Sequence, residues 1–220
     1  MLVHLGMTGK FFFINQKNTK YKTSFYYDIN EDKDKKHDRV IFNLSRNQKL
    51  IYNDVRKFGF IKFIKNINLK QNLHLKNLGP EPLEKKFNFS YFKQYIINKN
   101  RTIKDILMDQ KFISGLGNIY VNETLFFSGI KPTKKVKNLS EGEIRKIIKF
   151  IKRILSKAIA LGGSSIKNFS SNNGKKGLFQ QYFCVYGKKG EKCSKKSCGS
   201  NIIKIVISNR ATFYCDKCQK

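Results

Sequence analysis

Acidic residues are scarce in this 220-residue chain. It contains 15 Asp and Glu residues against 45 Lys and Arg residues, which gives a formal net charge of +30. We attribute part of the excess to a bias of the whole sequence toward Lys, Asn, Ile and Phe. A cation of this size attracts nucleic acid through counterion release, and such binding weakens steeply as the salt concentration rises. The charge alone leaves DNA, RNA and an anionic membrane surface open as partners.

Long hydrophobic runs are also missing. No apolar run approaches the roughly 20 residues that span a bilayer, and no signal peptide is visible at the start. We therefore expect a cytoplasmic protein that has no membrane partner. Hydrophobic residues still make up 40% of the chain, which is enough for a packed core and excludes global disorder. The sequence contains no internal repeat.

Cysteine is infrequent, but its positions are informative. Four of the five cysteines form two close pairs, Cys193/Cys198 and Cys215/Cys218, on either side of an apolar run at 202–207 that is typical of a strand. Four thiolates on two turns across a hairpin can surround one tetrahedral Zn²⁺ ion. The alternative is four free or disulfide-bonded cysteines, and the paired spacing favours zinc.

One arginine lies next to this predicted zinc ribbon. Arg210 precedes the second cysteine pair, at the tip of the hairpin or on its return strand. A guanidinium at that place can meet a phosphate group. The remaining cysteine, Cys184, is expected to be an inert, half-buried thiol, and this cysteine usage suits a reducing cytosol.

The first 77 residues are typical of short strands separated by polar turns. Aromatic and β-branched residues recur in short runs, and segments rich in Asn, Asp, Ser and Lys separate them. The expected strands lie near the N-terminus before Gly9 and at 11–13, 23–27, 39–44, 50–52 and 58–63. This pattern predicts an antiparallel sheet or sandwich. Because a domain rarely starts in mid-sheet, we expect some of its strands to be missing from the chain.

The pattern changes at the Pro- and Gly-containing segment 78–83, after which the periodicity of apolar residues is helical. Helical faces are expected from about residue 88, from 103 and from 119. Ser140 and Glu143 form a capping-box signature that opens a long amphipathic helix, and Gly162-Gly163 ends it. The polar segment between Lys167 and Gly177 is expected to be a mobile loop before the ribbon, which is either a connector or a lid beside a site.

The turn Ser114-Gly-Leu-Gly-Asn118 interrupts the helical pattern and opens the next helix. Glycines let backbone N–H groups approach an anion closely, and a helix N-terminus adds partial positive charge. Glycine in such a turn can also serve backbone geometry alone. In a chain this basic, which also contains a zinc ribbon, we expect the turn to bind phosphate, with Asn118 as a further donor.

These features occur within a set of motifs that extends along nearly the whole chain. In chain order they are His-Leu-Gly-Met-Thr-Gly at 4–9, Lys-His-Asp at 36–38, Asp-Val-Arg-Lys-Phe-Gly at 54–59, Leu-Gly-Pro-Glu-Pro-Leu at 78–83, Leu-Met-Asp-Gln at 107–110, Gly-Leu-Gly-Asn-Ile-Tyr at 115–120, Gly-Ile-Lys-Pro at 129–132, Val-Tyr-Gly-Lys-Lys-Gly-Glu at 185–191 and Arg-Ala-Thr-Phe-Tyr-Cys at 210–215. On these motifs the chain resembles the formamidopyrimidine-DNA glycosylases, bacterial enzymes that remove oxidised purines such as 8-oxoguanine. The endonuclease VIII family shares that fold, but resembles the chain less at 78–83 and around Arg210.

The resemblance implies an α+β fold with three parts. These are a partial N-terminal antiparallel β-sandwich over residues 1–77, a helix–two-turn–helix domain over 78–178 and a C-terminal zinc ribbon over 184–220. It also implies base-excision repair: excision of 8-oxoguanine and formamidopyrimidines, and nicking by β,δ-elimination as an AP (abasic-site) lyase. The expected partner is double-stranded DNA that carries oxidised purines or abasic sites. We further expect one structural Zn²⁺ ion, a monomer, and a place in the bacterial cytosol or nucleoid.

Residue roles follow from the resemblance by matching motifs. Met7, Arg56 and Phe58 match the trio that enters the duplex when a damaged nucleotide is flipped out. For Met7 and Phe58 the alternative is ordinary core packing. The further DNA-binding positions are His37, Lys99, Asn118 and Lys167, the last in a segment to Gly177 that closes over the flipped base. Arg210 matches the arginine that clamps phosphate with Asn118 and donates the proton for δ-elimination, and Cys193, Cys198, Cys215 and Cys218 match the zinc ligands.

The chain departs from the family pattern in two places. Four residues, instead of the usual two, separate Cys193 from Cys198, and we expect a longer loop with an intact zinc site. The family's nucleophilic N-terminal proline, its adjacent glutamate and a further lysine have no counterpart here. We therefore expect either a fragment or misplaced start of an enzyme, or an inactive remnant that still binds damaged DNA. A third hypothesis, an RNA-binding zinc-ribbon protein, accounts for the charge but not for Met7, Arg56 and Phe58.

Overall fold

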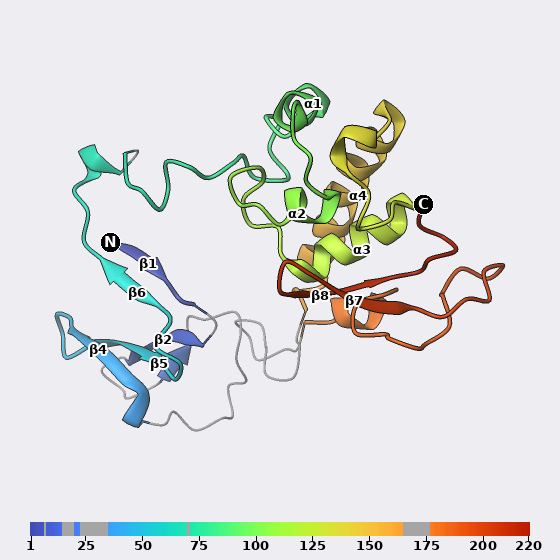
Figure 1. Ribbon diagram of the computed structural model, residues 1–220. Coiled ribbons are helices and arrows are strands. Elements are labelled where there is room, and N and C mark those ends of the chain that lie inside the picture. The colour runs from blue at the N-terminus through green and yellow to red at the C-terminus, as the bar shows by residue number, and fades with distance from the viewer. Residues whose placement is uncertain (7, 15–19, 23–34, 70, 165–176) are drawn as a thin grey trace. The chain divides into compact units, whose positions relative to one another are not determined.

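The computed structural model describes residues 1–6, 8–14, 20–22, 35–69, 71–164 and 177–220 (Figure 1). These residues form two compact units. One comprises residues 1–71 and 161–180, and the other comprises 72–160 and 181–220. Of the sequence predictions, the strand at 23–27, the loop between Lys167 and Gly177 and the two site residues Met7 and Lys167 lie outside the described residues.

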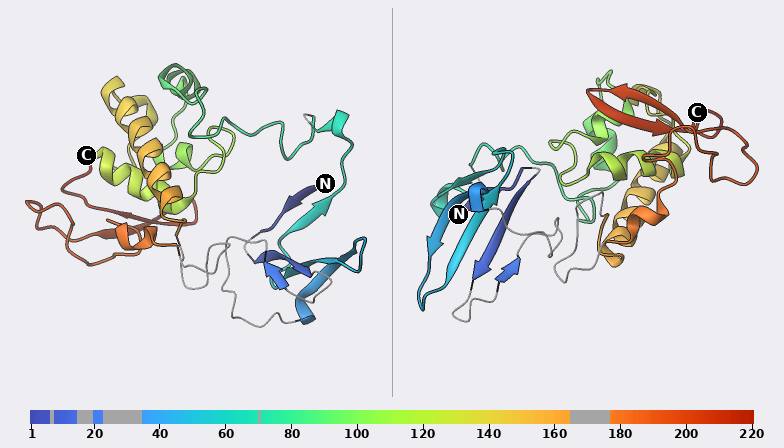
Figure 2. Two further views of the ribbon diagram at one scale, coloured as in Figure 1. Left: turned by 180° about the vertical axis from the view of Figure 1, so that it is seen from behind. Right: turned by 90° about the horizontal axis from the view of Figure 1, so that it is seen from below.

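The first unit is built from two antiparallel sheets (Figure 2). A two-stranded sheet pairs β1 (Leu2–His4) with β6 (Phe60–Lys62). A four-stranded sheet has the order β3 (Lys20–Lys22), β2 (Gly9–Ile14), β5 (Lys49–Asp54) and β4 (Asp38–Asn43). Two short 3₁₀ helices, η1 (Lys35–His37) and η2 (Asn66–Asn68), complete the elements of residues 1–71 that the structure describes.

The predicted antiparallel strands that fall on described residues are confirmed, with one correction. The strand expected at 58–63 is shorter, because Phe58 and Gly59 belong to the turn that connects β5 to β6. At Gly59 an added Cβ atom would lie 1.8 Å from the hydroxyl of the buried Tyr52, so only glycine fits beside that ring. The short strand β3 was not predicted, since Lys-Tyr-Lys carries no alternating apolar pattern.

The second unit contains the helices. Their bounds are α1 (Phe89–Ile96), α2 (Ile103–Leu107), α3 (Asn118–Ser128) and α4 (Glu141–Ala160), with short 3₁₀ helices η3 (Val136–Asn138) and η4 (Phe179–Tyr182), the last at the boundary between the units. The predicted apolar faces form one core. Its fully buried members include Phe92, Ile103, Ile106, Leu107, Leu125, Ile147 and Ile151. The helical predictions from 88, 103 and 119 are therefore confirmed.

The long helix α4 begins with the predicted capping box. The Ser140 backbone N–H donates to Glu143 Oε2 at 2.9 Å, and the Glu143 N–H donates to Ser140 Oγ at 3.2 Å. This reciprocal pair satisfies two of the backbone donors that a helix start leaves free. The apolar stripe of α4 faces the core, while the lysines and arginines between its members face solvent.

The C-terminal segment forms a hairpin of β7 (Ile203–Ile207) and β8 (Arg210–Tyr214). Ser208 and Asn209 make its two-residue turn with φ angles of 47° and 58°, the left-handed geometry that suits the twist of a tight hairpin. In Figure 1 the hairpin lies alongside α3, and β8 is the strand that contacts this helix. The α+β class is confirmed. No helix in the described part of the chain is long and apolar enough to cross a bilayer.

Candidate nucleic-acid interface and metal centre

The turn that precedes α3 has an open backbone. Gly115 has a φ of +77°, which favours glycine, and a Cβ atom added to Gly115 or Gly117 would meet no atom of the described residues within 4 Å. Gln110 braces the turn from the inside: its Oε1 accepts from the Gly115 N–H at 2.7 Å and its Nε2 donates to the Leu116 carbonyl at 3.2 Å. A ligand can therefore approach the N–H groups at the start of α3.

Asn118, the first residue of α3, is fixed to the ribbon hairpin. Its Nδ2 donates to the Ala211 carbonyl at 3.0 Å, and its Oδ1 accepts from Lys104 Nζ at 2.6 Å. Because Ala211 directly follows Arg210, these bonds bring the two predicted clamp residues into one site. Asn118 and Ala211 lie 93 positions apart in the sequence, so no local pattern predicts the hydrogen bond between them.

A second side chain ties the same strand to α3. Asn122 Oδ1 accepts from the Phe213 N–H at 2.7 Å, and its Nδ2 donates to the Asn118 carbonyl at 2.7 Å. Asn122 is fully buried, so these bonds are shielded from water. Strand β8 is thus held to the helix at two alternate residues, which fixes the backbone that carries Arg210.

Lys104 is a site residue that sequence reasoning missed. It lies in α2 between the apolar positions 103 and 106, and it is only 1% exposed. Burial, with the nearby Arg210 charge as a second cause, lowers the pKa of Lys104 to about 8. The one available signal was a lysine beside the apolar face of a short helix, which is too common to indicate a site.

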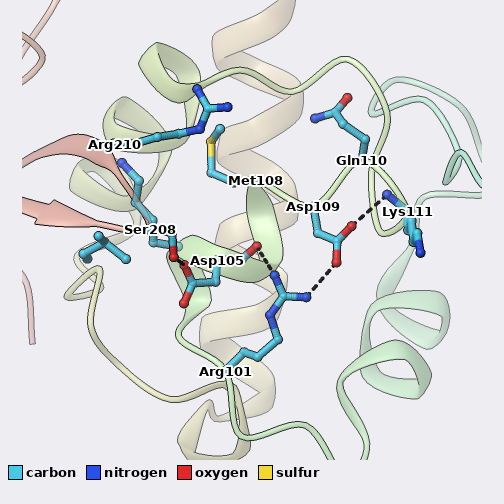
Figure 3. Close-up of a pocket in the computed structure, with 10 residues that line it drawn as sticks. Arg101, Asp105, Met108, Asp109, Gln110, Lys111, Ser208 and Arg210 are labelled. Atoms are coloured by element: carbon cyan, nitrogen blue, oxygen red, sulfur yellow. Dashed lines mark hydrogen bonds and ion pairs between the residues drawn. The ribbon is translucent and has the colours of Figure 1, made fainter.

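Within the part of the chain that the structure describes, the guanidinium of Arg210 is the group of this cluster that has no partner. The side chain is exposed, and among the described residues it has no hydrogen bond or ion pair. Figure 3 shows it extending away from the hairpin beside Met108. An unpaired guanidinium on a fixed strand, close to an open helix start, can bind a phosphate in bidentate geometry.

In the first unit, Arg56 and Phe58 lie together on the turn that follows β5. Both are exposed, and the guanidinium carbon of Arg56 lies 4.7 Å from the centre of the Phe58 ring. The exposure of Phe58, 58%, excludes the core-packing alternative for this residue. The turn thus carries an exposed aromatic ring and a guanidinium side by side, two groups that nucleic-acid-binding proteins use for stacking and hydrogen bonding.

The buried carboxylate of Asp54 holds this turn in shape. Its oxygens accept from the backbone N–H groups of Arg56 at 3.2 Å and Gly59 at 2.9 Å, and from the Tyr52 hydroxyl at 3.1 Å. The Thr8 hydroxyl, in the Met7-Thr8 motif, also donates to it. Burial alone would raise the pKa of Asp54, but these four hydrogen bonds together hold it below its usual value.

Two other predicted DNA-binding residues are found on different units. His37 ends η1, where its Nδ1 lies 3.4 Å from a guanidinium nitrogen of Arg39. Lys99 belongs to the second unit, and its ammonium lies 4.2 Å from the centre of the Tyr95 ring. Their DNA-binding roles remain predictions.

The four predicted zinc ligands come together. The Sγ atoms of Cys193, Cys198, Cys215 and Cys218 all lie within 4.8 Å of one another. The Cys193–Cys218 and Cys198–Cys215 sulfur distances are 3.8 and 3.4 Å, close to the roughly 3.8 Å expected from a tetrahedron with Zn–S bonds of about 2.3 Å. The longer first loop is accommodated by a turn in which Cys198 N–H donates to the Lys195 carbonyl at 3.0 Å. The donor set and its geometry fit a structural zinc ion.

The metal centre is joined directly to the end of α3. Gln219 Oε1 accepts from the Cys215 N–H, and Gln219 Nε2 donates to the Ile130 carbonyl, each at 2.9 Å. On the other side, the buried carboxylate of Glu123 accepts from three successive backbone N–H groups at 184–186, at 2.8 to 3.0 Å. Zinc binding and the position of β8 are therefore mechanically linked.

Comparison with known proteins gives a consistent result. The profile of the formamidopyrimidine-DNA glycosylase N-terminal domain matches residues 1–61, and that of the formamidopyrimidine-DNA glycosylase H2TH domain matches residues 78–170. The formamidopyrimidine-DNA glycosylase of Rickettsia bellii is 42% identical over 220 residues, and that of a Bradyrhizobium species is 37% identical over 226. All of this chain is covered, with 74% and 76% of these relatives.

Solved structures agree. The Lactococcus lactis protein in complex with DNA containing an abasic site superposes with a TM-score of 0.81 at 36% identity, covering 99% of this chain and 74% of that one. The same values hold for a variant of that protein bound to DNA that contains Fapy-dG. The chain therefore belongs to the formamidopyrimidine-DNA glycosylase family.

Proposed function

We propose that this chain acts in base-excision repair as a glycosylase and AP lyase on double-stranded DNA that carries oxidised purines or abasic sites. The family is one of base-excision repair enzymes, and solved relatives hold such DNA. The observation in this chain that carries the proposal is the fixed pairing of Asn118 with the strand of Arg210. That pairing sets two phosphate-binding groups side by side on a rigid frame.

The clamp works through donors that are already in place. The open N–H groups at the start of α3 and the exposed guanidinium of Arg210 bind one backbone phosphate at the lesion. Lys104 keeps the Asn118 amide oriented through its 2.6 Å contact with Oδ1. Because the donors need no rearrangement, little of the binding free energy is lost in ordering them.

Arg210 also takes the chemical role that the family pattern assigns to it. In δ-elimination the bond between the sugar and its remaining phosphate breaks, and the leaving phosphate oxygen needs positive charge or a proton. A guanidinium that holds this phosphate can supply both. The four-cysteine zinc ion contributes structure to this arrangement and no reaction step, since all its ligand positions are filled by protein.

The turn with Arg56 and Phe58 supplies the second function, recognition of the damaged base pair. An aromatic ring can occupy the space that a flipped nucleotide leaves, and a guanidinium can bond the orphaned base. Met7 has the same role in this proposal. Acting on genomic DNA of a bacterium, the chain works in the cytosol at the nucleoid, as a monomer.

The experiment is incision and borohydride trapping with the 220-residue chain. The substrates are a duplex with 8-oxoguanine opposite cytosine, a duplex with an abasic site, and single-stranded RNA as a control. Incision with a trapped covalent adduct would show that an amine of these residues attacks the sugar. Tight binding to the abasic duplex without incision would support the second candidate, a non-catalytic protein that binds damaged DNA. Equal binding to RNA and to both duplexes would overturn both.

A further inference from the structure

A pocket of about 460 Å³ lies between α2, the residues that follow it and the tip of the β7–β8 hairpin (Figure 3). Its charged lining residues are four cations and two acids: Arg101, Lys104, Lys111 and Arg210 against Asp105 and Asp109. Among these charged residues, Arg210 and Lys104 belong to the clamp proposed above. The other four have no role in the proposed function. Its net charge favours an anion.

The two carboxylates repel an anion less strongly than their number suggests, because both already accept hydrogen bonds. Asp109 accepts from the Arg101 guanidinium at 2.6 Å and from the Lys111 backbone N–H at 3.0 Å. Asp105 accepts from the hydroxyl groups of Ser208 and Thr102 at 2.5 and 2.7 Å. Each carboxylate thus has donors of its own on two sides.

Two hydrogen bonds hold the Arg101 guanidinium in place without using all of its N–H donors. Its Nη1 donates to Asp109 and its Nη2 donates to the Asp105 carbonyl at 3.0 Å. A guanidinium carries five N–H donors, so these two bonds leave others for a ligand. With a side chain that is 46% exposed, Arg101 is both oriented and accessible.

Arg210 reaches the same pocket from the opposite side. In Figure 3 the Arg101 side chain lies beside Asp109 on the side of α2, and the Arg210 side chain extends from the hairpin beside Met108. Both arginines line the pocket, from different elements, and a guanidinium is suited to a tetrahedral oxyanion, which accepts several hydrogen bonds at once.

We propose that this pocket binds a second backbone phosphate of the DNA strand, next to the phosphate held by Asn118 and Arg210, and that Arg101 is its principal ligand. The inference rests on the proposed binding of duplex DNA. Arg101 then lengthens the contacted stretch of strand by one phosphate and contributes equally to damaged and undamaged duplexes, because phosphate contacts carry no sequence information.

The test is the salt dependence of binding. Affinity for a labelled duplex with one tetrahydrofuran abasic analogue, and for its undamaged match, is measured between low and moderate salt. Each phosphate contact adds about 0.9 to the slope of log K against log salt, so Arg101→Gln should lower the slope by about 1 on both duplexes. Lys146→Gln, an exposed lysine on α4, should leave the slope unchanged.

A merely structural role for Arg101 predicts a different pattern. Arg101 pairs with Asp109, so a structural pair would be disrupted equally by Arg101→Gln and Asp109→Asn. We expect Asp109→Asn to keep the full slope. If Arg101→Gln does not fold, the double variant Arg101→Gln/Asp109→Asn replaces it, since it leaves no unpaired carboxylate. An unchanged slope in Arg101→Gln, or an equal loss in Asp109→Asn, would overturn the proposal.

The outcome is independent of the test of function. If the unmodified chain does not prefer the abasic duplex, the proposed function fails, yet the slope difference on undamaged DNA still reports on Arg101. If the preference is present and the slope of Arg101→Gln is unchanged, only the second phosphate site fails.

Discussion

The Ser208 hydroxyl donates a 2.5 Å hydrogen bond to the carboxylate of Asp105, which lies 103 residues earlier in the chain. This bond connects the tip of the ribbon hairpin to the start of α2 (Figure 3). Arg210 follows Ser208 by two residues, so the bond restrains the strand that carries the predicted phosphate ligand. Burial alone would raise the pKa of Asp105, but the bonds from Ser208 and Thr102 and the charge of Arg101 hold it below its usual value.

Removing this bond should loosen Arg210 without unfolding the protein. We expect Ser208→Ala to weaken binding to an abasic duplex by about 1 kcal/mol, which is about fivefold in Kd. Fluorescence anisotropy measures the affinity, and Ser156→Ala on the exposed side of α4 is the matched control. Thermal stability should change by less than about 0.5 kcal/mol. Affinity equal to that of the control would contradict the positioning role.

Lys104 makes the second unit sensitive to alkaline pH. Its pKa of about 8 in the folded chain lies below the value of 10.5 for an exposed lysine. Between these values the unfolded state binds more protons, so the free energy of unfolding should rise as pH increases from about 8 to about 10.5. Below pH 8 the buried charge costs its full amount. Urea unfolding of the unmodified chain and of Lys104→Met across this range measures the effect, and a rise that persists in Lys104→Met would contradict it.

The same lysine should influence DNA binding. Because Lys104 Nζ holds Asn118 Oδ1, we expect Lys104→Met to weaken binding to an abasic duplex by about tenfold at pH 7, the loss typical of a charge-assisted hydrogen bond. Lys146→Met removes the same charge from an exposed site on α4 and serves as the control. Equal effects of the two substitutions would show that only net charge matters.

Asp54 should determine how the first unit responds to acid. Since its pKa is lowered in the folded chain, its stabilisation is complete above the unfolded value of about 3.9 and is lost as pH falls through the folded value. Asp54→Asn replaces a carboxylate that accepts four hydrogen bonds with an amide, and should cost about 2 kcal/mol at pH 7. Unfolding measured from pH 2 to 7 tests this. The stability difference between the two proteins should shrink in acid, and a constant difference would be inconsistent with this account.

The zinc centre should be needed for order in the hairpin. We expect Cys215→Ser, or removal of metal by a chelator, to abolish stoichiometric zinc and to lower the stability of β7 and β8, because Cys215 is fully buried and directly follows β8. Metal analysis and hydrogen exchange of the hairpin amides are the measurements. Cys184→Ser lies outside the four-cysteine cluster and should keep its zinc. Full zinc occupancy in Cys215→Ser would rule out the four-cysteine site.

Local patterns predicted the second unit well. Three features could be predicted because each depends on residue spacing within a short stretch. They are the capping box of Ser140 and Glu143, the apolar faces of the helices and the four-cysteine cluster. The glycine turn and the position beside the cysteine pair singled out Asn118 and Arg210, and the resemblance to the family added that they act together. The structure shows how Ala211 joins them.

Several features that escaped prediction depend on contacts between residues far apart in the sequence. The hydrogen bonds from Ser208 to Asp105 and from Lys104 to the Ala211 carbonyl each join residues more than 100 positions apart. The periodicity of apolar residues does not predict such pairs. The strand expected at 58–63 was too long for a more local reason: Asp54 accepts a hydrogen bond from the Gly59 N–H, five residues later, and shapes the turn there. The domain boundaries and the individual roles of the DNA-binding residues remain predictions.

The most direct test of the central claim is the affinity of the unmodified chain for a duplex with one tetrahydrofuran abasic analogue, compared with the same duplex undamaged, at one fixed salt concentration. We predict binding to the abasic duplex that is tighter by at least about tenfold, in line with the discrimination typical of specific protein–DNA complexes. Arg210→Ala should remove most of this preference. Equal affinity for the two duplexes, or an unchanged preference in Arg210→Ala, would contradict recognition of damaged DNA through the Asn118–Arg210 clamp.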